Sequence, residues 1–548
     1  MNIAQHVERG HHLFPDQIAL LFEGRSYSYR DLDQMANRVA NGLTALGIHR
    51  GDRIALFLPN IPEFIISYLG IVKIGAVAVA LNAMLKSTEV SFILNDCSAK
   101  AIVTTAELVD NVSESDLPEL KHVLIAEGQA TTGIDLAAMI ANASPDARAI
   151  EMDRYAPAAI VYTSGTTGFP KGATLSHGNI ISNSYSQNRC CGMQAEDRIL
   201  LYLPLFHCFG QNAVLNAALN SGSTIVLHRN FDLEKILKSV VTEKITMFFS
   251  VPTIYIVLLN MGTKSGYDLS SVRYYFSAAA PLPAEVAQKW YDKYGQYIHQ
   301  GYGLTETSPC ASYNHDFKYK FGSVGTPIEN VEMKIVHADG RDALPGELGE
   351  LAIRGPNVML GYWNRPFETA EVIKNGWFYT GDIGHIDEDG YFYIVDRSKD
   401  MINVAGFKVY PTEVENVIYQ HPAVAEAAVF GVPNVETTEM VRAHIVLKEG
   451  QVVTDKQIIA FCSERMAAYK VPKAVKFVDS IPKNPTGKIL KRVLRDQAAS
   501  EMATKRSVPV ASSTVKPTTT VATQPATDTN NSGKGVFKAL GNFFKPRT

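Results

Sequence analysis

The amino-acid sequence predicts an α/β protein of several domains, and two observations lead to this prediction. The chain has 548 residues, which is too long for one compact hydrophobic core. Short runs rich in Val, Ile and Ala alternate with longer amphipathic segments through most of the chain, as in buried strands and helices of largely parallel sheets. The predicted strands are 53–58, 75–81, 101–103, 158–162 and 224–227, and the predicted helices include 29–46 and 63–74.

The pattern changes near residue 325. Residues 325–396 alternate polar and apolar side chains and are rich in turns, which predicts a small antiparallel β unit. Residues 397–500 then predict a compact α+β domain, with a helix at 412–421 and strands at 425–432 and 441–447. We therefore expect a large N-terminal domain, 1–396, and a small C-terminal domain, 397–500, that meet within 396–400.

The last part of the chain has a different composition. Residues 501–532 are rich in Thr, Ser and Pro, which predicts a disordered linker. Residues 533–548 follow as a basic amphipathic tail, in which Val536, Phe537, Leu540, Phe543 and Phe544 share one helical face. Our hypothesis is that this tail docks on a membrane surface or on a partner protein. Its glycines disfavour a stable helix, so an inert tail remains the alternative.

Composition excludes several classes of protein. The net charge of −3 provides no basic field for nucleic acid. The six cysteines contain no C-x-x-C pair, which favours a reducing compartment over a disulfide scaffold. The first residues do not resemble a signal peptide, and the most apolar stretch, 247–261, is shorter than the roughly 20 residues that a membrane span needs. We expect a soluble cytoplasmic protein that is at most peripheral to a membrane.

The strongest local motif is Tyr162-Thr-Ser-Gly-Thr-Thr-Gly-Phe-Pro-Lys-Gly172, directly after a predicted strand. Backbone N–H groups and hydroxyls of such a loop can surround phosphate oxygens, and a lysine can add a positive charge. The candidate phosphate-binding residues are Thr163, Ser164, Gly165, Thr166, Thr167, Gly168 and Lys171. Taken alone, the motif is equally well explained as a glycine-rich surface turn.

Three further segments occur in a fixed order after this loop: Gln300-Gly-Tyr-Gly-Leu-Thr-Glu306, Tyr379-Thr-Gly-Asp382 continuing to 396–402, and Pro485-Thr-Gly-Lys488. With these four segments, residues 5–497 resemble the adenylate-forming superfamily, and most closely its bacterial fatty-acid–CoA ligases. The resemblance implies a large N-terminal domain, a mobile C-terminal domain and two half-reactions. A carboxylate first attacks the α-phosphate of ATP, and the thiol of coenzyme A then displaces AMP.

The resemblance also implies roles for individual residues. Thr163 to Lys171 would hold the β- and γ-phosphates, and Thr163 and Glu306 would hold Mg²⁺. Thr305 would touch the α-phosphate, Tyr302 would stack under adenine, and Asp382 and Arg397 would bind the ribose. Ala279, Gly301 and Gly303 would line the nucleotide and acyl pocket. His207 would lie between the acyl phosphate and the arriving thiol, and Lys488 would bridge the carboxylate and the α-phosphate.

Two further residues are implied to serve the mobile domain. Lys399 would be the hinge about which that domain rotates. Gly406 would let the pantetheine arm of coenzyme A pass close to the backbone. Without the resemblance, Lys399 would be interpreted as an exposed linker lysine.

The sequence does not determine which acid is the substrate or which thiol accepts the acyl group. His207 replaces the aspartate that binds an ammonium group in amino-acid adenylation domains, so amino acids are not expected. Glycine at 303, where acetate synthetases have tryptophan, is expected to leave room for a longer acid. The first choice is a fatty acid of medium to long chain, and an aromatic acid of the coumarate type is the second. Transfer to the phosphopantetheine of an acyl carrier protein stays an alternative to CoA. A non-catalytic binding protein is disfavoured because Lys171, Glu306 and Lys488 are all present.

Overall fold

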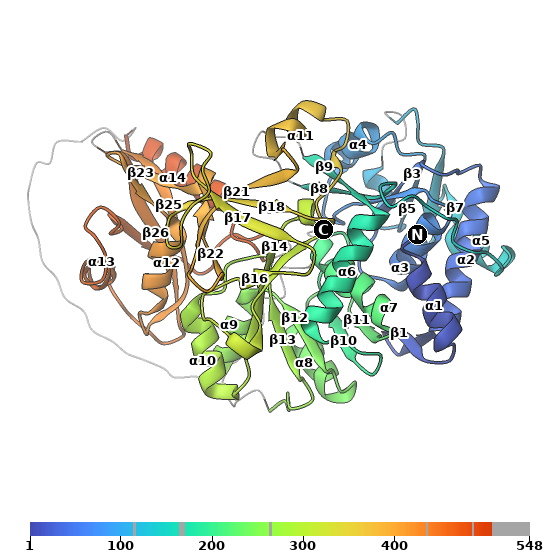
Figure 1. The fold of residues 1–548 in the computed structure, drawn as a ribbon, viewed down its shortest axis with the longest axis horizontal. Helices are drawn as coiled ribbons and strands as arrows, with labels where there is room; N and C mark the ends of the chain where they lie inside the picture. Colours follow the sequence, from blue (N-terminus) through green and yellow to red (C-terminus); the bar gives the residue numbers. More distant parts are fainter. Residues whose placement is uncertain (113–116, 164–169, 262–265, 435–436, 485–486, 507–548) are drawn as a thin grey trace, which may run out of the picture. The chain divides into compact units, whose positions relative to one another are not determined.

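The computed structural model describes residues 1–112, 117–163, 170–261, 266–434, 437–484 and 487–506 (Figure 1). The chain divides into two compact units, Met1–Ser398 and Lys399–Asn484, and the described residues 488–506 belong to the second unit. The boundary lies within 396–400, where the sequence pattern changes. Residues 164–168 of the predicted phosphate loop and the tail from residue 507 lie outside the described residues.

The first unit contains an eight-stranded sheet in the order β19-β9-β8-β4-β3-β5-β6-β7. Six of its strands are parallel, whereas β9 and β19 run antiparallel to their neighbours. Helix α4 (Ser87–Asp96) covers one face, where Ile93 and Leu94 pack with Phe57 and Ile102. The strands are β3 (Arg53–Phe57), β4 (Val77–Ala80), β5 (Ala101–Thr104), β6 (His122–Ile125), β7 (Ile134–Asp135), β8 (Pro157–Thr163), β9 (Lys171–Ser176) and β19 (Gly361–Tyr362); the helices beside them include α2 (Tyr29–Ala45), α3 (Pro62–Lys73) and α5 (Leu136–Asn142).

A nine-stranded sheet follows the order β16-β15-β14-β13-β12-β10-β11-β1-β2. Its six central strands are parallel. The strands are β1 (Ile18–Phe22), β2 (Arg25–Ser28), β10 (Arg198–Leu201), β11 (Thr224–Leu227), β12 (Met247–Ser250), β13 (Tyr274–Ser277), β14 (Ile298–Gly303), β15 (Cys310–Tyr313) and β16 (Thr326–Pro327). Its neighbouring helices are α1 (Gln5–Leu13), α6 (His177–Cys191), a π-helix (Phe209–Asn216), α7 (Ala217–Ser221), α8 (Leu233–Thr242), α9 (Pro252–Met261) and α10 (Ala284–Tyr294). The apolar stretch 247–261 therefore folds as β12 followed by α9.

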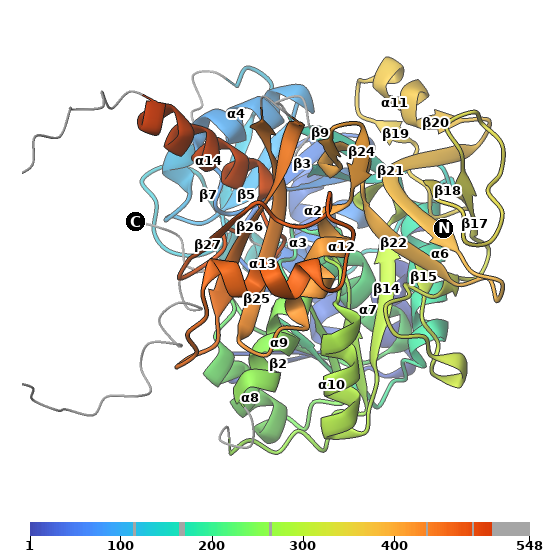
Figure 2. The ribbon, with the colours of Figure 1, turned by 90° about the vertical axis from the view of Figure 1, so that its left-hand side faces the viewer.

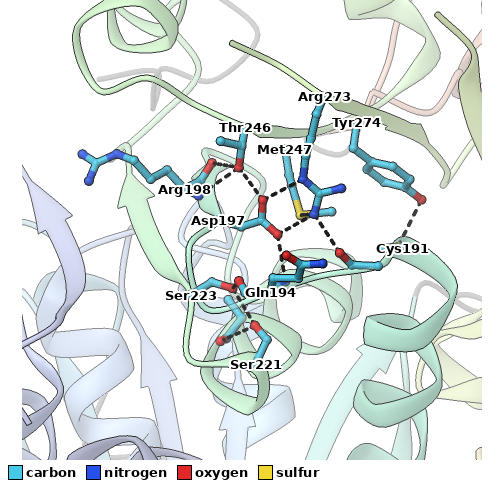
Figure 3. A network of polar contacts seen from close by, with 12 residues as sticks. Cys191, Gln194, Asp197, Arg198, Ser221, Ser223, Thr246, Met247, Arg273 and Tyr274 are labelled. Atoms are coloured by element: carbon cyan, nitrogen blue, oxygen red, sulfur yellow. Dashed lines mark hydrogen bonds and ion pairs between the residues drawn. The ribbon is translucent and has the colours of Figure 1, made fainter. Parts of the chain in front are cut away.

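A polar network joins the amino ends of three of these parallel strands (Figure 3). Asp197 precedes β10, Thr246 precedes β12 and Arg273 precedes β13. The Asp197 carboxylate accepts hydrogen bonds from the Thr246 hydroxyl at 2.7 Å and from Arg273 Nε at 2.9 Å and Nη2 at 2.6 Å. Because Asp197 is only 4% exposed, this network fixes the three strands relative to one another. The carboxyl ends of the same strands lead into the candidate site.

A smaller antiparallel sheet completes the first unit. It consists of β17 (Glu332–Val336), β18 (Gly349–Arg354), β20 (Ile373–Lys374), β21 (Trp377–Ile386) and β22 (Phe392–Arg397), with α11 (Pro366–Val372) before β20. Ile335, Leu351 and Phe392 pack together in its core. This is the β-rich segment that the alternating pattern predicts.

The second unit is an α+β fold (Figure 2), and its strand β25 separates two hydrophobic cores. Ala427 and Val429 pack with α12 and α13, whereas the alternate residues Ala428 and Phe430 pack with α14. The period of two along the strand thus places helices on both faces. The elements are β23 (Ile402–Val404), β24 (Phe407–Val409), α12 (Pro411–Tyr419), β25 (Val424–Asn434), β26 (Thr438–Leu447), α13 (Asp455–Ser463), β27 (Ala474–Phe477) and α14 (Lys491–Arg506). Within the described ranges of the whole chain, every helix is too short or too polar to cross a bilayer.

Candidate active site

The predicted phosphate loop connects two antiparallel strands. Thr163 ends β8 and pairs with Lys171, the first residue of β9. The Thr163 hydroxyl donates to the Lys171 carbonyl oxygen at 3.4 Å. The ammonium nitrogen of Lys171 lies 5.3 Å from the ring centroid of Tyr362. The structure therefore places both ends of the loop, and residues 164–168 fall outside the described part.

The segment from Gly301 to Glu306 runs from β14 into a short 3₁₀ helix, Thr305–Thr307. Thr305 and Glu306 are each 8% exposed. Two buried asparagines anchor the residues that follow: Asn183 Nδ2 donates to the Cys310 carbonyl at 2.7 Å, and Asn357 Nδ2 donates to the Thr307 carbonyl at 3.1 Å. Helix α6 and the segment before β19 thereby hold Glu306 in place.

The surroundings of Glu306 suit a carboxylate that binds a magnesium ion. The Tyr362 hydroxyl donates to its Oε1 at 2.9 Å, and no cationic side chain of the described residues forms an ion pair with it. Magnesium bound to a nucleotide commonly takes one or two protein carboxylates and fills its other positions with phosphate oxygens and water. Among the described residues no cluster of three or more His, Cys, Asp or Glu side chains could form an all-protein metal cage. Glu306, with the Thr163 hydroxyl, has the hard oxygen donors that such a nucleotide-bound ion requires.

A second group surrounds Asp382 in β21. Its Oδ2 accepts a hydrogen bond from the Tyr302 hydroxyl at 2.5 Å, and its Oδ1 lies 3.1 Å from Arg397 Nε. Asp382 is 4% exposed and pairs in the β21–β22 ladder with Arg397. Tyr302, Asp382 and Arg397 therefore form one connected cluster, although they come from distant parts of the sequence.

His207 lies in the segment after β10. Its Nδ1 accepts a hydrogen bond from the Phe209 backbone N–H at 3.2 Å. The neighbouring Cys208 is 2% exposed, and its Sγ lies 3.4 Å from the Thr305 hydroxyl. Burial raises the pKa of the Cys208 thiol to about 12, so this sulfur is protonated at neutral pH. His207 is thus connected to the Thr305 segment through its neighbour.

The predicted pocket residues Ala279, Gly301 and Gly303 each have a restricted backbone conformation or a close neighbour. Ala279 has φ +70°, a left-handed conformation that is strained for a residue with a Cβ. A Cβ at Gly301 would lie 2.5 Å from Phe276 Cζ. A Cβ at Gly303 would lie 1.7 Å from the Pro309 carbonyl oxygen. The approach of the Pro309 backbone therefore requires glycine at 303, and the expectation that this glycine leaves room for a longer acid stays a prediction.

Lys399, Gly406 and Lys488 belong to the second unit. Lys399 lies in a 3₁₀ turn, Ser398–Asp400. Gly406 and Ala405 form the turn between β23 and β24 with φ +90° and +51°, and the Gly406 N–H donates to Asn403 Oδ1 at 2.9 Å. The Lys488 backbone N–H donates to Asn484 Oδ1 at 2.8 Å, and its carbonyl accepts from the Asn484 N–H at 2.8 Å. Gly406 and Lys488 therefore both occupy turns whose backbone is held by hydrogen bonds.

Sequence reasoning missed Tyr362, Asn183 and Asn357. Each contacts the Thr305–Cys310 segment, but each lies in a different element far away along the chain. The only local signal at Tyr362 is its position in the aromatic pair Tyr362-Trp363, which by itself predicts burial rather than a site.

Parallel-rich sheets with buried carboxylates such as Glu306 and Asp382 beyond their strands are typical of nucleotide-binding enzymes. The model of the AMP-binding enzyme family matches residues 7–363, and the model of the AMP-binding enzyme C-terminal domain matches residues 413–488. The chain belongs to this family, and it is an AMP-forming acid–thiol ligase.

Individual relatives agree with this assignment. The chain is 37% identical over 520 residues to a long-chain-fatty-acid–CoA ligase of Bacillus subtilis (strain 168), covering 88% of this chain and 92% of that protein. It is 36% identical over 483 residues to a feruloyl-CoA synthase of an Amycolatopsis species, covering 88% and 96%. A solved anthranilate CoA ligase in complex with anthranoyl-AMP superposes with a TM-score of 0.87 at 32% identity, covering 92% and 98%.

Proposed function

We propose that this chain activates a fatty acid of medium to long chain with ATP and transfers the acyl group to coenzyme A. The observation that supports the ATP-dependent part of the proposal most directly is the position of the segment Gly301–Glu306. Tyr302 at its start contacts Asp382, and Glu306 at its end contacts Tyr362 beside Lys171. A nucleotide whose ribose lies at Asp382 would extend its phosphates towards Lys171 and Glu306.

For the first half-reaction, the residues of the first unit would bind and orient ATP. Asp382 would accept hydrogen bonds from the ribose hydroxyls, with Arg397 beside it, and Tyr302 would contact the adenine. Lys171 and the loop hydroxyls would hold the β- and γ-phosphates, and Thr305 the α-phosphate. Glu306 and Thr163 would hold Mg²⁺, which when bound would neutralise charge on the phosphates.

Residues of the second unit would serve the two steps in turn. Lys488 would donate to the carboxylate and α-phosphate oxygens while negative charge develops there. Rotation about Lys399 would then replace Lys488 by the Gly406 turn, past which the pantetheine arm reaches the acyl-adenylate. His207 would separate the acyl phosphate from the incoming thiol.

A fatty acid is the first choice because two long-chain-fatty-acid–CoA ligases match at 37% and 38% identity, slightly above the 36% of the feruloyl-CoA synthase. An aromatic acid is the second candidate, because a feruloyl-CoA synthase and an anthranilate CoA ligase match over similar lengths. The acceptor is proposed to be CoA, and carrier-protein phosphopantetheine is the alternative. A contact of the tail 533–548 with a membrane surface or a partner protein also remains a proposal.

The proposal is tested by measuring kcat/KM for a graded series of saturated fatty acids and for ferulate, with CoA or with a pantetheinylated carrier protein. We expect acyl-CoA formation that peaks at one fatty chain length. A preference for ferulate over every fatty acid would contradict the substrate class. Acyl-adenylate that accumulates with CoA and reacts only with the carrier protein would contradict the acceptor.

A further inference from the structure

Tyr362 lies between the two oppositely charged residues that are proposed to bind the polyphosphate of ATP. Its hydroxyl donates to Glu306 Oε1 at 2.9 Å, and its ring centroid lies 5.3 Å from Lys171 Nζ. The tyrosine thus combines a hydrogen bond to a carboxylate with a cation–π contact to an ammonium group.

The backbone around Tyr362 is held on both sides. Tyr362 pairs with Ala173 in the β19–β9 ladder, two residues after Lys171. The Trp363 N–H donates to the Gly172 carbonyl at 2.7 Å, and the Met359 N–H donates to the Glu306 carbonyl at 2.8 Å. One short segment therefore connects the strand that begins with Lys171 to the turn that contains Glu306. The backbone on either side of Tyr362 is therefore held at both places.

The position of the ring has an electrostatic consequence. A lysine and a glutamate that lie close together attract each other, and a direct ion pair between them would neutralise both charges. No such pair between Lys171 and Glu306 occurs within the described residues, and each instead contacts the neutral Tyr362. The phenol satisfies one oxygen of the carboxylate and leaves the positive charge of Lys171 available for phosphate.

We propose that Tyr362 is a positioning residue for the adenylation half-reaction. It holds Lys171 and Glu306 apart and oriented, so that one meets the phosphate oxygens and the other the magnesium ion of ATP. This inference rests on the proposed nucleotide site and adds to it a residue that binds neither phosphate nor acid itself.

The test compares Tyr362→Phe, which keeps the ring over Lys171 and removes the hydroxyl, with Tyr362→Leu, which removes both contacts. Tyr391→Phe is the matched control. The Tyr391 hydroxyl donates to the Lys318 carbonyl at 2.6 Å, and Lys320 Nζ lies 4.6 Å from its ring centroid. The control therefore loses a tyrosine hydrogen bond to a neutral carbonyl beside a lysine, in a part of the first unit with no proposed catalytic role.

Three readouts are measured on the full chain: calorimetric affinity for ATP with and without Mg²⁺, acid-dependent pyrophosphate exchange, and the reaction of supplied acyl-adenylate with CoA. Loss of a hydrogen bond to a charged group corresponds to about a tenfold effect or more. We expect Tyr362→Phe to weaken magnesium-dependent ATP binding and to slow exchange by about tenfold. Tyr362→Leu should lower the affinity for magnesium–ATP and the exchange rate further. The rate of the adenylate–CoA reaction should stay within about twofold of wild type in both variants.

Two results would overturn the proposal: unchanged magnesium-dependent binding in Tyr362→Phe, or an equal loss of both half-reactions, which indicates general structural damage. The binding measurement needs no acid. If the wild-type chain binds magnesium–ATP but exchanges no pyrophosphate with any acid, the proposed function fails while the role of Tyr362 is still decided by binding.

Discussion

At the scale of single residues, buried carboxylates of the first unit have partners of two kinds. Asp197 is surrounded by Thr246 and the guanidinium of Arg273, which neutralises its charge within the protein. Glu306 instead accepts a hydrogen bond from a neutral tyrosine. A neutral donor orients a carboxylate and leaves its negative charge for a ligand, whereas an ion pair uses that charge for stability.

Replacing Asp197 by alanine should destabilise the first unit. The substitution removes the carboxylate that links the residues preceding β10, β12 and β13. Arg273 and Thr246 then lose their shared hydrogen-bond acceptor. We expect a loss of about 3 kcal/mol, measured from the midpoint of urea unfolding. Glu285→Ala, which breaks the exposed pair with Lys289, is the control and should cost less than about 1 kcal/mol. Equal midpoints for the two variants would show that the network of Figure 3 adds no stability.

Replacing Lys488 by alanine should separate the two half-reactions. The proposed role of its ammonium group is limited to the charge that develops during adenylation. We expect pyrophosphate exchange to fall by a factor on the order of 100 while supplied acyl-adenylate still reacts with CoA. The same loss in both assays would remove Lys488 from this role.

At the scale of elements, helix α6 joins the N-terminus to the site. Ser176 caps the helix in a reciprocal pair with Asn179, and Asn183 one turn later anchors Cys310. His177 at the start is fully buried, and its Nδ1 accepts a hydrogen bond from the Ile3 N–H at 3.2 Å. The helix thereby couples the fold of the N-terminal residues to the loop that contains Glu306.

This arrangement predicts acid sensitivity. Burial, with smaller contributions from the N-terminal charge and Arg50, lowers the pKa of His177 from 6.5 to about 4. Below pH 6.5, His177 therefore binds a proton in the unfolded chain but not in the folded chain. The free energy of unfolding decreases as the pH falls towards 4. The loss is about 3 kcal/mol when complete. His177→Gln should flatten the decline of Tm between pH 7 and pH 5, and an unchanged decline would exclude His177 as its source.

The turn at Gly406 permits a second test of an element. Gly406→Leu should leave adenylation intact and suppress thioester formation, because a bulky side chain would stand in the proposed path of pantetheine. Gly450→Leu is the matched control: both glycines have positive φ, +90° and +75°, with open space around the missing Cβ. Normal thioester formation in Gly406→Leu, or an equal defect in the control, would contradict the proposed path.

The elements that the sequence predicts best are those with a local cause. The helices at 29–46 and 63–74 are found as α2 and α3, and the strands at 53–58 and 101–103 as β3 and β5, because apolar periodicity alone specifies them. Strand β19 has only two residues, which is too short for a periodic pattern. It forms only because it pairs with β9, which lies far away in the sequence. The same holds for Tyr362, and the packing of Gly303 against Pro309 could be recognised only in three dimensions.

At the scale of the whole molecule, the proposed site residues are divided between the two units. Thr163, Lys171, Glu306 and Asp382 belong to the first unit, whereas Lys399, Gly406 and Lys488 belong to the second. The first set would bind the nucleotide throughout the cycle, and the second set would provide one group for each half-reaction. On the proposed roles, this division would assign one group of the second unit to each of the two half-reactions.

Product stoichiometry tests the central claim most directly. The full chain is incubated with ATP, Mg²⁺, CoA and the best acid of the series, and the quenched reaction is analysed by mass spectrometry. We predict acyl-CoA and AMP in equal amounts, pyrophosphate beside them, and acyl-adenylate when CoA is omitted. ADP and phosphate as the nucleotide products, or AMP formed without acid, would contradict activation through an adenylate.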